Sequence, residues 1–171
     1  MNRLIAVVLC SLMWGGTAFA GCVGTITAST PTADFVDHGN GTVTHIKTGL
    51  MWKRCSEGSS GINCTTGTPT QYTWQGALKA AKSLNESGGF AGFTDWRVPS
   101  IKELHFIVEN KCVTPSVNAA IFPGTVSSWY WSASPYIGFA GVAWGGYFSV
   151  GANGAGFKTT DGYVRLVRGG Q

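Results

Sequence analysis

The stretch DWRVPSIKEL brings two acids, two bases and a serine within ten residues. Such a group could in principle supply a nucleophile and an acid–base pair. The spacing has a simpler use, because Ser100 lies three residues before Glu103 at the start of an apolar run, which is the pattern of a capping box. Asp95 and Arg97 alternate around Trp96 in an extended segment, where they could pair with each other or brace a loop. We therefore predict a structural role for the stretch, at the start of a helix of about ten residues.

The other residues that could do chemistry form no recognised motif. No GxSxG elbow, HExxH, Walker loop or GxGxxG is present. His38, His45 and His105 are scattered without the spacing of metal ligands, and the loop around Asp37 and Asn40 offers one carboxylate where calcium needs several oxygens. We expect no cofactor, no metal and no enzymatic activity. One alternative stays open, because folding could bring two carboxylates together as in glycan-cleaving enzymes.

Residues 1–20 have the pattern of a secretory signal peptide. Arg3 precedes an apolar run, Leu4–Trp14, and the segment ends in the small-x-small triplet Ala18-Phe19-Ala20. The run is shorter than the roughly 20 residues that span a bilayer, and no later segment comes close to that length. The sequence therefore predicts export to the periplasm, the cell surface or the medium. A lipoprotein, with Cys22 as the lipidated residue, is the alternative.

Four cysteines remain after the predicted signal peptide, an even number that indicates two disulfides in an exported chain. Cys55 and Cys64 flank the loop SEGSSGIN and pair naturally across it, which leaves Cys22 to pair with Cys112. The even count also argues against lipidation of Cys22, which would leave Cys112 alone. A zinc site is disfavoured because the chain has neither a CxxC pair nor a histidine next to its cysteines.

The composition indicates one loop-rich domain. Removing 20 residues from 171 leaves 151, enough for a single domain with its own core. Charged residues make up 12%, there are 25 glycines, and the formal charge of +4 becomes +3 without Arg3. This mild basicity permits an acidic partner, but no Lys/Arg run suggests nucleic-acid binding. We divide the chain into a polar N-terminal arm, residues 21–34, and a domain, residues 35–171.

Hydrophobic periodicity predicts an α+β fold. Asn40-Gly41 is the signal of a two-residue hairpin turn. Strand-forming residues, 42–44 and 50–52, lie on either side of a second turn at residues 47–49. Apolar residues at helical spacing on one face predict a helix over residues 73–85, with Thr73 as its N-cap. The last third contains short runs of aromatic and β-branched residues separated by glycines, which predict an antiparallel meander that ends with a strand over residues 163–168.

The aromatic residues of that last third could form a binding surface. Trp129 and Tyr136 flank a Ser/Pro/Gly loop and are expected to be exposed, while Lys158 and Arg168 supply positive charge. Arg165 and Arg168 lie on opposite faces of the predicted strand, so one of them is expected to be braced and partly buried. The candidate ligand-binding residues are Trp129, Tyr136, Lys158 and Arg168.

Motifs spread over almost the whole domain resemble the family named after the C-terminal region of the Legionella collagen-like protein. They are DHGNGTVTHIKTGLMWKRC, YTWQGALKAAKSLN, FTDWRVPSIKEL, YWSASP, AW with YFSVG, and YVRLVR. The resemblance covers Phe35 to Arg168. It implies a C-type-lectin-like fold and an extracellular, non-catalytic, ligand-binding role like that of the namesake domain, which binds sulfated glycosaminoglycans.

Three departures limit what the resemblance implies. Leu166 stands where family members commonly have a cysteine, which agrees with pairing Cys22 and Cys112. The chain has no collagen-like stalk, so trimerisation is not implied. It also lacks the Glu-Pro-Asn or Gln-Pro-Asp triplet with which C-type lectins hold calcium and sugar.

The leading hypothesis from the sequence is a secreted or surface-associated binding module that recognises an anionic, glycosaminoglycan-like polysaccharide. This hypothesis rests on the combination of predicted export, aromatic loops, mild basicity and family resemblance. The second hypothesis is a structural or protein-interaction component of an envelope or pilus assembly, with a partner that the sequence does not identify. The third is the glycan-acting enzyme.

Overall fold

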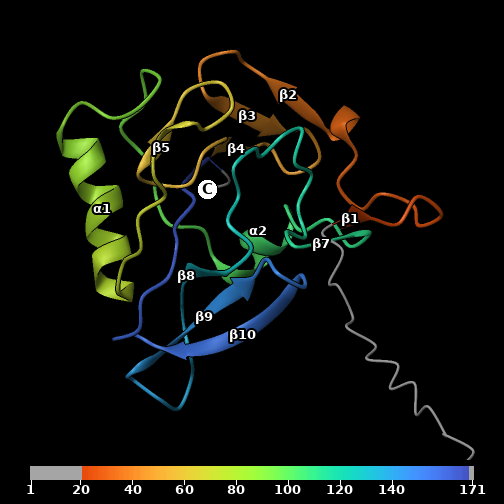
Figure 1. Ribbon diagram of the computed structural model, residues 1–171. Coiled ribbons are helices and arrows are strands. Elements are labelled where there is room, and N and C mark those ends of the chain that lie inside the picture. Colours follow the sequence, from red (N-terminus) through yellow and green to blue (C-terminus); the bar gives the residue numbers. More distant parts are fainter. Residues whose placement is uncertain (1–20, 170–171) are drawn as a thin grey trace, which may run out of the picture.

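Two antiparallel sheets lie at opposite ends of the molecule in the computed structural model, which describes residues 21–169 (Figure 1). The predicted signal peptide lies outside the described residues. No helix in the described part of the chain has the length and hydropathy of a membrane span. The predicted α+β class is confirmed.

The elements are β1 Gly21–Cys22, η1 Thr32–Asp34, β2 Phe35–Asp37, β3 Thr42–His45, β4 Leu50–Lys53, β5 Ser59–Ser60, β6 Thr66–Gly67, α1 Trp74–Glu86, α2 Ile101–His105, β7 Cys112–Val113, β8 Trp129–Pro135, β9 Val142–Tyr147, β10 Ala152–Phe157 and β11 Val167–Arg168.

The two larger of the four sheets in residues 21–169 are a four-stranded sheet with the order β11-β4-β3-β2 and a three-stranded meander, β10-β9-β8. Strands β1 and β7, and strands β5 and β6, form two small two-stranded sheets. The strand predicted over residues 163–168 is shorter than expected, because this segment bridges the two sheets. Trp131 N donates to Tyr163 O at one end, and Lys53 N donates to Leu166 O near the other. Only β11 joins a sheet, beside β4, so the end of the domain returns to its beginning.

The β2–β3 hairpin confirms the turn signal but not its length. Four residues, not two, connect the strands, and the left-handed positions are Gly39 and Gly41, with φ of 70° and 86°. Asn40 acts through its side chain, because its Oδ1 accepts from the backbone N of Thr42 at 3.2 Å and from the Thr42 hydroxyl at 2.7 Å. The asparagine therefore stabilises the loop by an Asx-type contact.

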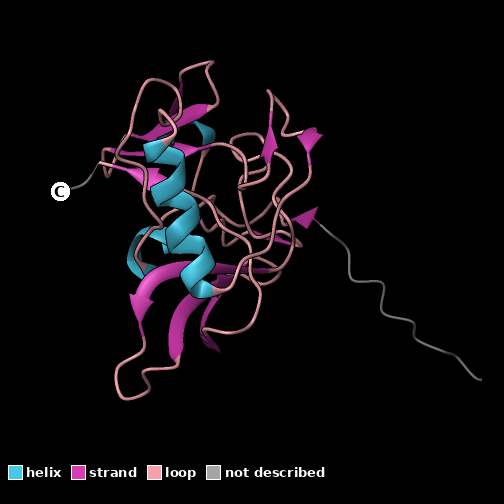
Figure 2. Ribbon diagram, turned by 90° about the vertical axis from the view of Figure 1, so that its left-hand side faces the viewer, coloured by secondary structure: helices cyan, strands magenta, loops and turns pink. Residues whose placement is uncertain are grey.

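Helix α1 runs along the side of the molecule, past both sheets (Figure 2). It begins as predicted, with the Thr73 side chain accepting from Gly76 N, and it buries Ala77 and Ala81. Helix α2 has the predicted capping box: Glu103 N donates to Ser100 Oγ, and Ser100 N donates to Glu103 Oε2.

Helix α2 has five residues where the sequence predicts about ten. The chain leaves the helix because Val108 forms a β-bridge with Val117, and Glu109 N donates to Ser116 O. These pairings demand extended backbone, so tertiary hydrogen bonds override the helical spacing of the apolar residues.

Two buried clusters form the core. One lies around Trp52, Phe122 and Tyr130 and joins the two sheets. The other lies under α1 and contains Trp96 and Trp131. Most tryptophans are thus packing residues, as their strand and helix positions predict.

Both predicted disulfides are confirmed. Cys55–Cys64 closes the glycine-rich loop, and Cys22–Cys112 joins β1 to β7, which also pair as strands. In the Cys22–Cys112 bond the sulfur atom of Cys22 is already in a disulfide, whereas lipidation would require it as a free thiol. The polar arm is also held by Glu109, whose carboxylate accepts from Ser29 N at 2.9 Å and Thr30 N at 2.8 Å.

Candidate functional site

The carboxylates of the described chain are dispersed, and each of six acids pairs with a different base. The pairs are Lys47–Asp34, Lys53–Glu57, Arg54–Asp37, Lys82–Glu86, Arg97–Glu103 and Arg168–Asp95. Retaining and inverting glycosidases need two acids that face one sugar, one of them with a raised pKa. Paired, separate carboxylates give no support to that arrangement.

The stretch DWRVPSIKEL shows the same pattern. Asp95 and Arg97 do not pair with each other. Arg97 forms two bonds with the Glu103 carboxylate, at 2.8 Å and 2.6 Å, and Asp95 pairs with Arg168 at 2.7 Å. The hydrogen bond from Arg97 lowers the pKa of Glu103, and the bond from Arg168 lowers the pKa of Asp95. Both carboxylates are thus kept ionised, which suits bracing and not proton donation.

No group of three metal-ligating side chains occurs among residues 21–169. Two of the three histidines have hydroxyl contacts instead: His38 Nε2 lies 2.8 Å from Thr44 Oγ1, and His45 Nδ1 lies 2.9 Å from Thr48 Oγ1. These hydroxyl partners explain the positions of both rings as parts of the β2–β3 region.

The expectation that Trp129 is exposed is wrong. Its side chain is buried, with only 9% of the residue exposed, and its ring lies edge-on to Trp131 at 5.2 Å and beside Tyr147 at 4.6 Å. Gly145 and Gly162 make this possible, because a Cβ at either position would overlap the Trp129 ring. The indole therefore fills space that glycines on neighbouring segments leave open.

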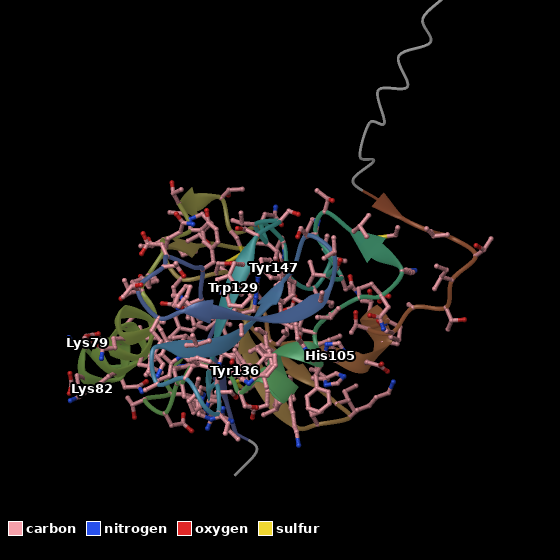
Figure 3. The ribbon with its side chains drawn as sticks, turned by 90° about the horizontal axis from the view of Figure 1, so that it is seen from below. Lys79, Lys82, His105, Trp129, Tyr136 and Tyr147 are labelled. Atoms are coloured by element: carbon pink, nitrogen blue, oxygen red, sulfur yellow. A yellow bond between two sulfur atoms is a disulfide. The ribbon has the colours of Figure 1, made fainter. Side chains whose placement is uncertain are left out.

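Tyr136 directly follows β8 and is half-buried, so the expectation of an exposed ring is met only in part. Figure 3 shows Tyr136 across the sheet from Trp129 and Tyr147. Its ring packs against Phe139 at 6.2 Å and Trp144 at 5.0 Å. The β8–β9 loop also exposes 93% of Ile137 and 66% of Phe139. We call Tyr136, Ile137, Phe139 and Trp144 the aromatic tip.

Ile137 and Phe139 are absent from the sequence-based candidates. The signal that could have found them is PYIGFAG, in which apolar residues alternate with glycines in a predicted loop. Large apolar side chains in a turn between two strands have no core to enter, so they point to a contact surface.

Lys158 braces the base of the aromatic tip. Its ammonium group donates to Ala140 O at 2.7 Å and lies 4.3 Å from the centre of the Trp74 ring. No acid pairs with it in the part of the chain that the structure describes. The charge is therefore held beside the tip and is uncompensated by an ion pair.

Arg168 does not belong to that surface. It lies in β11, in the other sheet, where its guanidinium pairs with Asp95 and stacks on Phe93 at 3.8 Å. The four predicted ligand-binding residues therefore do not form one patch. Tyr136 and Lys158 lie at the tip, Trp129 is buried, and Arg168 is neutralised at the opposite end of the molecule.

A separate hollow of about 460 Å³ lies between the β2–β3 turn, the Cys55–Cys64 loop and Phe90. Its charged side chains are compensated within the protein, since Arg54 pairs with Asp37 and Lys53 pairs with Glu57. Lys53 also lies 4.5 Å from the centre of the Phe90 ring. The hollow thus has a mainly apolar lining, and its charged side chains leave no free charge to attract an ionic ligand.

Residues 41–168 match the family model described as the Lcl C-terminal domain. The matched range contains both helices, the meander and the aromatic tip, and it begins after the polar arm and β2. No curated protein matches the chain.

Proposed function

We propose that this chain, which belongs to the Lcl C-terminal domain family, is an exported, non-catalytic binding module whose main contact surface is the aromatic tip. The observation that carries the proposal is the exposure of Ile137 and Phe139 beside the half-buried rings of Tyr136 and Trp144, which pack at a tilt. Exposure of large apolar side chains does not stabilise the folded domain, so a contact surface explains why these side chains lie at the surface. The two disulfides support export, because they persist in oxidising compartments.

The ligand in this proposal is a polysaccharide, held by stacking of sugar faces on the aromatic rings. Lys158 adds one positive charge, whereas Arg168 contributes none because Asp95 neutralises it. Stacking therefore contributes more than charge, and a strongly anionic ligand is not required. The C-type-lectin-like fold stays part of the proposal and rests on the family resemblance.

The absence of catalysis is also a proposal, supported by the dispersed carboxylates. Six of the eight acids are neutralised by six bases, and Glu109 is buried under donors from Ser29 and Thr30. Among residues 21–169 only Asp161, which is exposed, lies outside these contacts. An acid in such surroundings is stabilised as a carboxylate and has no free partner for glycan cleavage.

A glycan array probed with the oxidised mature protein tests the proposal. Replacing Tyr136 and Phe139 together with alanine should abolish binding, because stacking on each ring contributes roughly 0.5–1.5 kcal/mol beyond its buried area. Ile46→Ala is the matched control, since Ile46 is also exposed but lies in the β3–β4 turn. Equal binding by the parent and the double variant would refute the assignment of the tip.

The salt dependence of the same array separates stacking from charge. With a single uncompensated lysine at the tip, affinity should change little between low and physiological ionic strength. A steep loss of binding with salt would instead indicate recognition of an anionic polysaccharide through other basic residues.

A protein partner within an envelope or pilus assembly is the second candidate. The observation that favours it is Ile137, an aliphatic side chain that is almost fully exposed at the end of the tip. Aliphatic side chains contribute to protein interfaces through burial and do not stack on sugars. This candidate is favoured if no glycan on the array binds. It also requires a protein that co-purifies stoichiometrically with the parent but not with Ile137→Ser.

A further inference from the structure

Strand β10 forms an open edge of the three-stranded sheet. It pairs with β9 on one side only, in a register from Ala152 opposite Tyr147 to Phe157 opposite Val142. Lys158 N donates to Gly141 O, and hydrogen-bonded pairs alternate along an antiparallel ladder. The even-numbered residues of β10 therefore bond to β9, and Asn153, Ala155 and Phe157 direct their backbone groups outward.

Nothing in the strand protects this edge. Natural edge strands are blunted by charged side chains, proline, bulges or a covering segment. The sequence of β10, ANGAGF, has no charge and no proline, and its pairing with β9 is continuous. Phe157 is 68% exposed at the end of the strand. An unprotected edge with an exposed phenylalanine is suited to pairing with another strand.

We propose that a second copy of this chain pairs with β10 through its own β10, antiparallel and centred on Ala155. The outward residues 153, 155 and 157 are symmetric about that position, so the two-fold axis places Ala155 opposite Ala155 and Phe157 opposite Asn153. This self-complementary register is what a two-fold interface requires. The two uncharged strands meet without like-charge repulsion.

Four backbone hydrogen bonds follow from this register. The two Ala155 residues exchange two bonds, and each Phe157 N donates to the Asn153 O of the other copy. The Phe157 carbonyl already accepts from Thr160 N at 2.9 Å and Thr160 Oγ1 at 2.7 Å. It is therefore not counted as an acceptor across the interface.

A hollow beside Asn153 receives the side chain of Phe157. Residues that face each other across an antiparallel pair project to the same side of the sheet, so Phe157 of one copy lies next to Asn153 of the other. There, a hollow of about 290 Å³ is lined by Ile101 and Phe106 of the α2 region, with Lys102 and His105 at its border. The apolar lining suits a phenyl ring, and the ammonium group of Lys102 suits its π face.

The area of contact indicates a weak dimer. One pair of short strands and two inserted phenylalanines give an interface at the lower end of the roughly 1,200–2,000 Å² of specific complexes. We therefore expect association in the micromolar range. Trp144 lies opposite Ala155 in the β9–β10 ladder, but Tyr136, Ile137 and Phe139 belong to the β8–β9 connection. That connection stays outside the paired strands, so the inference does not depend on the ligand proposed for the tip.

Sedimentation velocity of the oxidised protein over a range of concentrations tests the dimer. The parent should associate, and Phe157→Ser should raise the dissociation constant about tenfold or more, since each copy loses a buried aromatic side chain. Ala155→Pro should leave only monomer, because it removes an outward donor, a position where edge strands tolerate proline. Ile137→Ser, which removes an exposed apolar side chain at the tip, should associate like the parent. A parent that stays monomeric, or an Ala155→Pro variant that associates equally, would overturn the proposal.

Cysteine cross-linking tests the register without relying on the proline variant. Directly opposed residues of a hydrogen-bonded antiparallel pair have Cα atoms about 5.5 Å apart, within the range of a disulfide. Ala155→Cys should therefore form a covalent dimer under air oxidation. Asn153→Cys is the control, since Asn153 lies opposite Phe157 and not opposite itself. Equal cross-linking of both variants would show random collision and refute the symmetric register.

Discussion

Arg165 places a positive charge in the core between the two sheets. Its guanidinium donates to the backbone carbonyls of Lys53 and Arg54 and to Thr125 Oγ1 at 2.7 Å, and it lies 4.7 Å from the centre of the Phe122 ring. Burial lowers the pKa of Arg165, but the group stays protonated because arginine starts so high. The guanidinium takes the place of water as the hydrogen-bond donor to the backbone carbonyls of Lys53 and Arg54, at the end of β4. It is the braced arginine that the alternation of the last strand predicts.

Arg165→Met should destabilise the protein by about 3 kcal/mol, because it leaves buried carbonyls without a donor. The free energy of unfolding in urea measures the effect. Lys79→Met is the matched control, since Lys79 is exposed on α1, and its change should stay within about 0.5 kcal/mol. Equal stability of the two variants would contradict the bracing role of Arg165.

At the level of elements, Glu109 attaches the polar arm to the domain. Only 1% of the residue is exposed, and its carboxylate accepts from the backbone N–H groups of Ser29, Thr30 and Lys111. Burial acts to raise the pKa of Glu109, but these hydrogen bonds together outweigh burial and lower the pKa below its ordinary value of 4.5. The arm is therefore part of the folded structure, although the family match begins after it.

The stabilisation from Glu109 should depend on pH. Because the folded-state pKa lies below 4.5, the carboxylate stabilises the protein fully above pH 4.5, and this stabilisation is lost as the pH falls through the folded-state pKa. Glu109→Gln should lower the free energy of unfolding by roughly 2–3 kcal/mol at pH 7, and the difference from the parent should narrow at pH 3.

Urea unfolding of the parent and Glu109→Gln at both pH values measures this difference. The control is Glu86→Gln, since Glu86 forms only an exposed pair with Lys82. A difference between Glu109→Gln and the parent that is the same at pH 7 and pH 3 would contradict the role of the ionised carboxylate.

For the whole molecule, the two disulfides close loops of very different length. Cys22 and Cys112 are 90 residues apart, and Cys55 and Cys64 are 9 apart. A cross-link that closes a longer loop removes more entropy from the unfolded chain. Replacing both cysteines of the long-range bond with serine should cost about 4.5 kcal/mol, against about 2.7 kcal/mol for the short-range bond. Urea unfolding of the two double variants compares them, and a larger cost for the short loop would contradict the entropic account.

Features that depend on neighbours in the chain could be predicted from the sequence. The helix expected over residues 73–85 is α1, and the capping box of Ser100 and Glu103 is present. The antiparallel meander is also present, but the segment over residues 163–168 that was predicted to end it lies outside that sheet. Both disulfides could be predicted because four cysteines with one short loop leave a single natural pairing. These signals act over a few residues, so the rest of the fold cannot easily change them.

Contacts between distant segments could not be predicted. Asp95 pairs with Arg168, which is 73 residues away, and not with Arg97, which is two residues away. Trp129 is buried because glycines from other segments leave room for it, and α2 ends early because Val108 pairs with Val117. The spacing of apolar residues within one segment does not predict which residues of a distant segment will pair with it.

The sequence by itself determined the α+β class, the family, both disulfides and the presence of aromatic residues in the meander. Only the tertiary structure decided which of those aromatics is exposed, that the four predicted ligand-binding residues do not form one surface, and that β10 has an open edge. The reason is physical: local propensity and cysteine count act along the chain, whereas exposure and charge pairing depend on which segments meet in space.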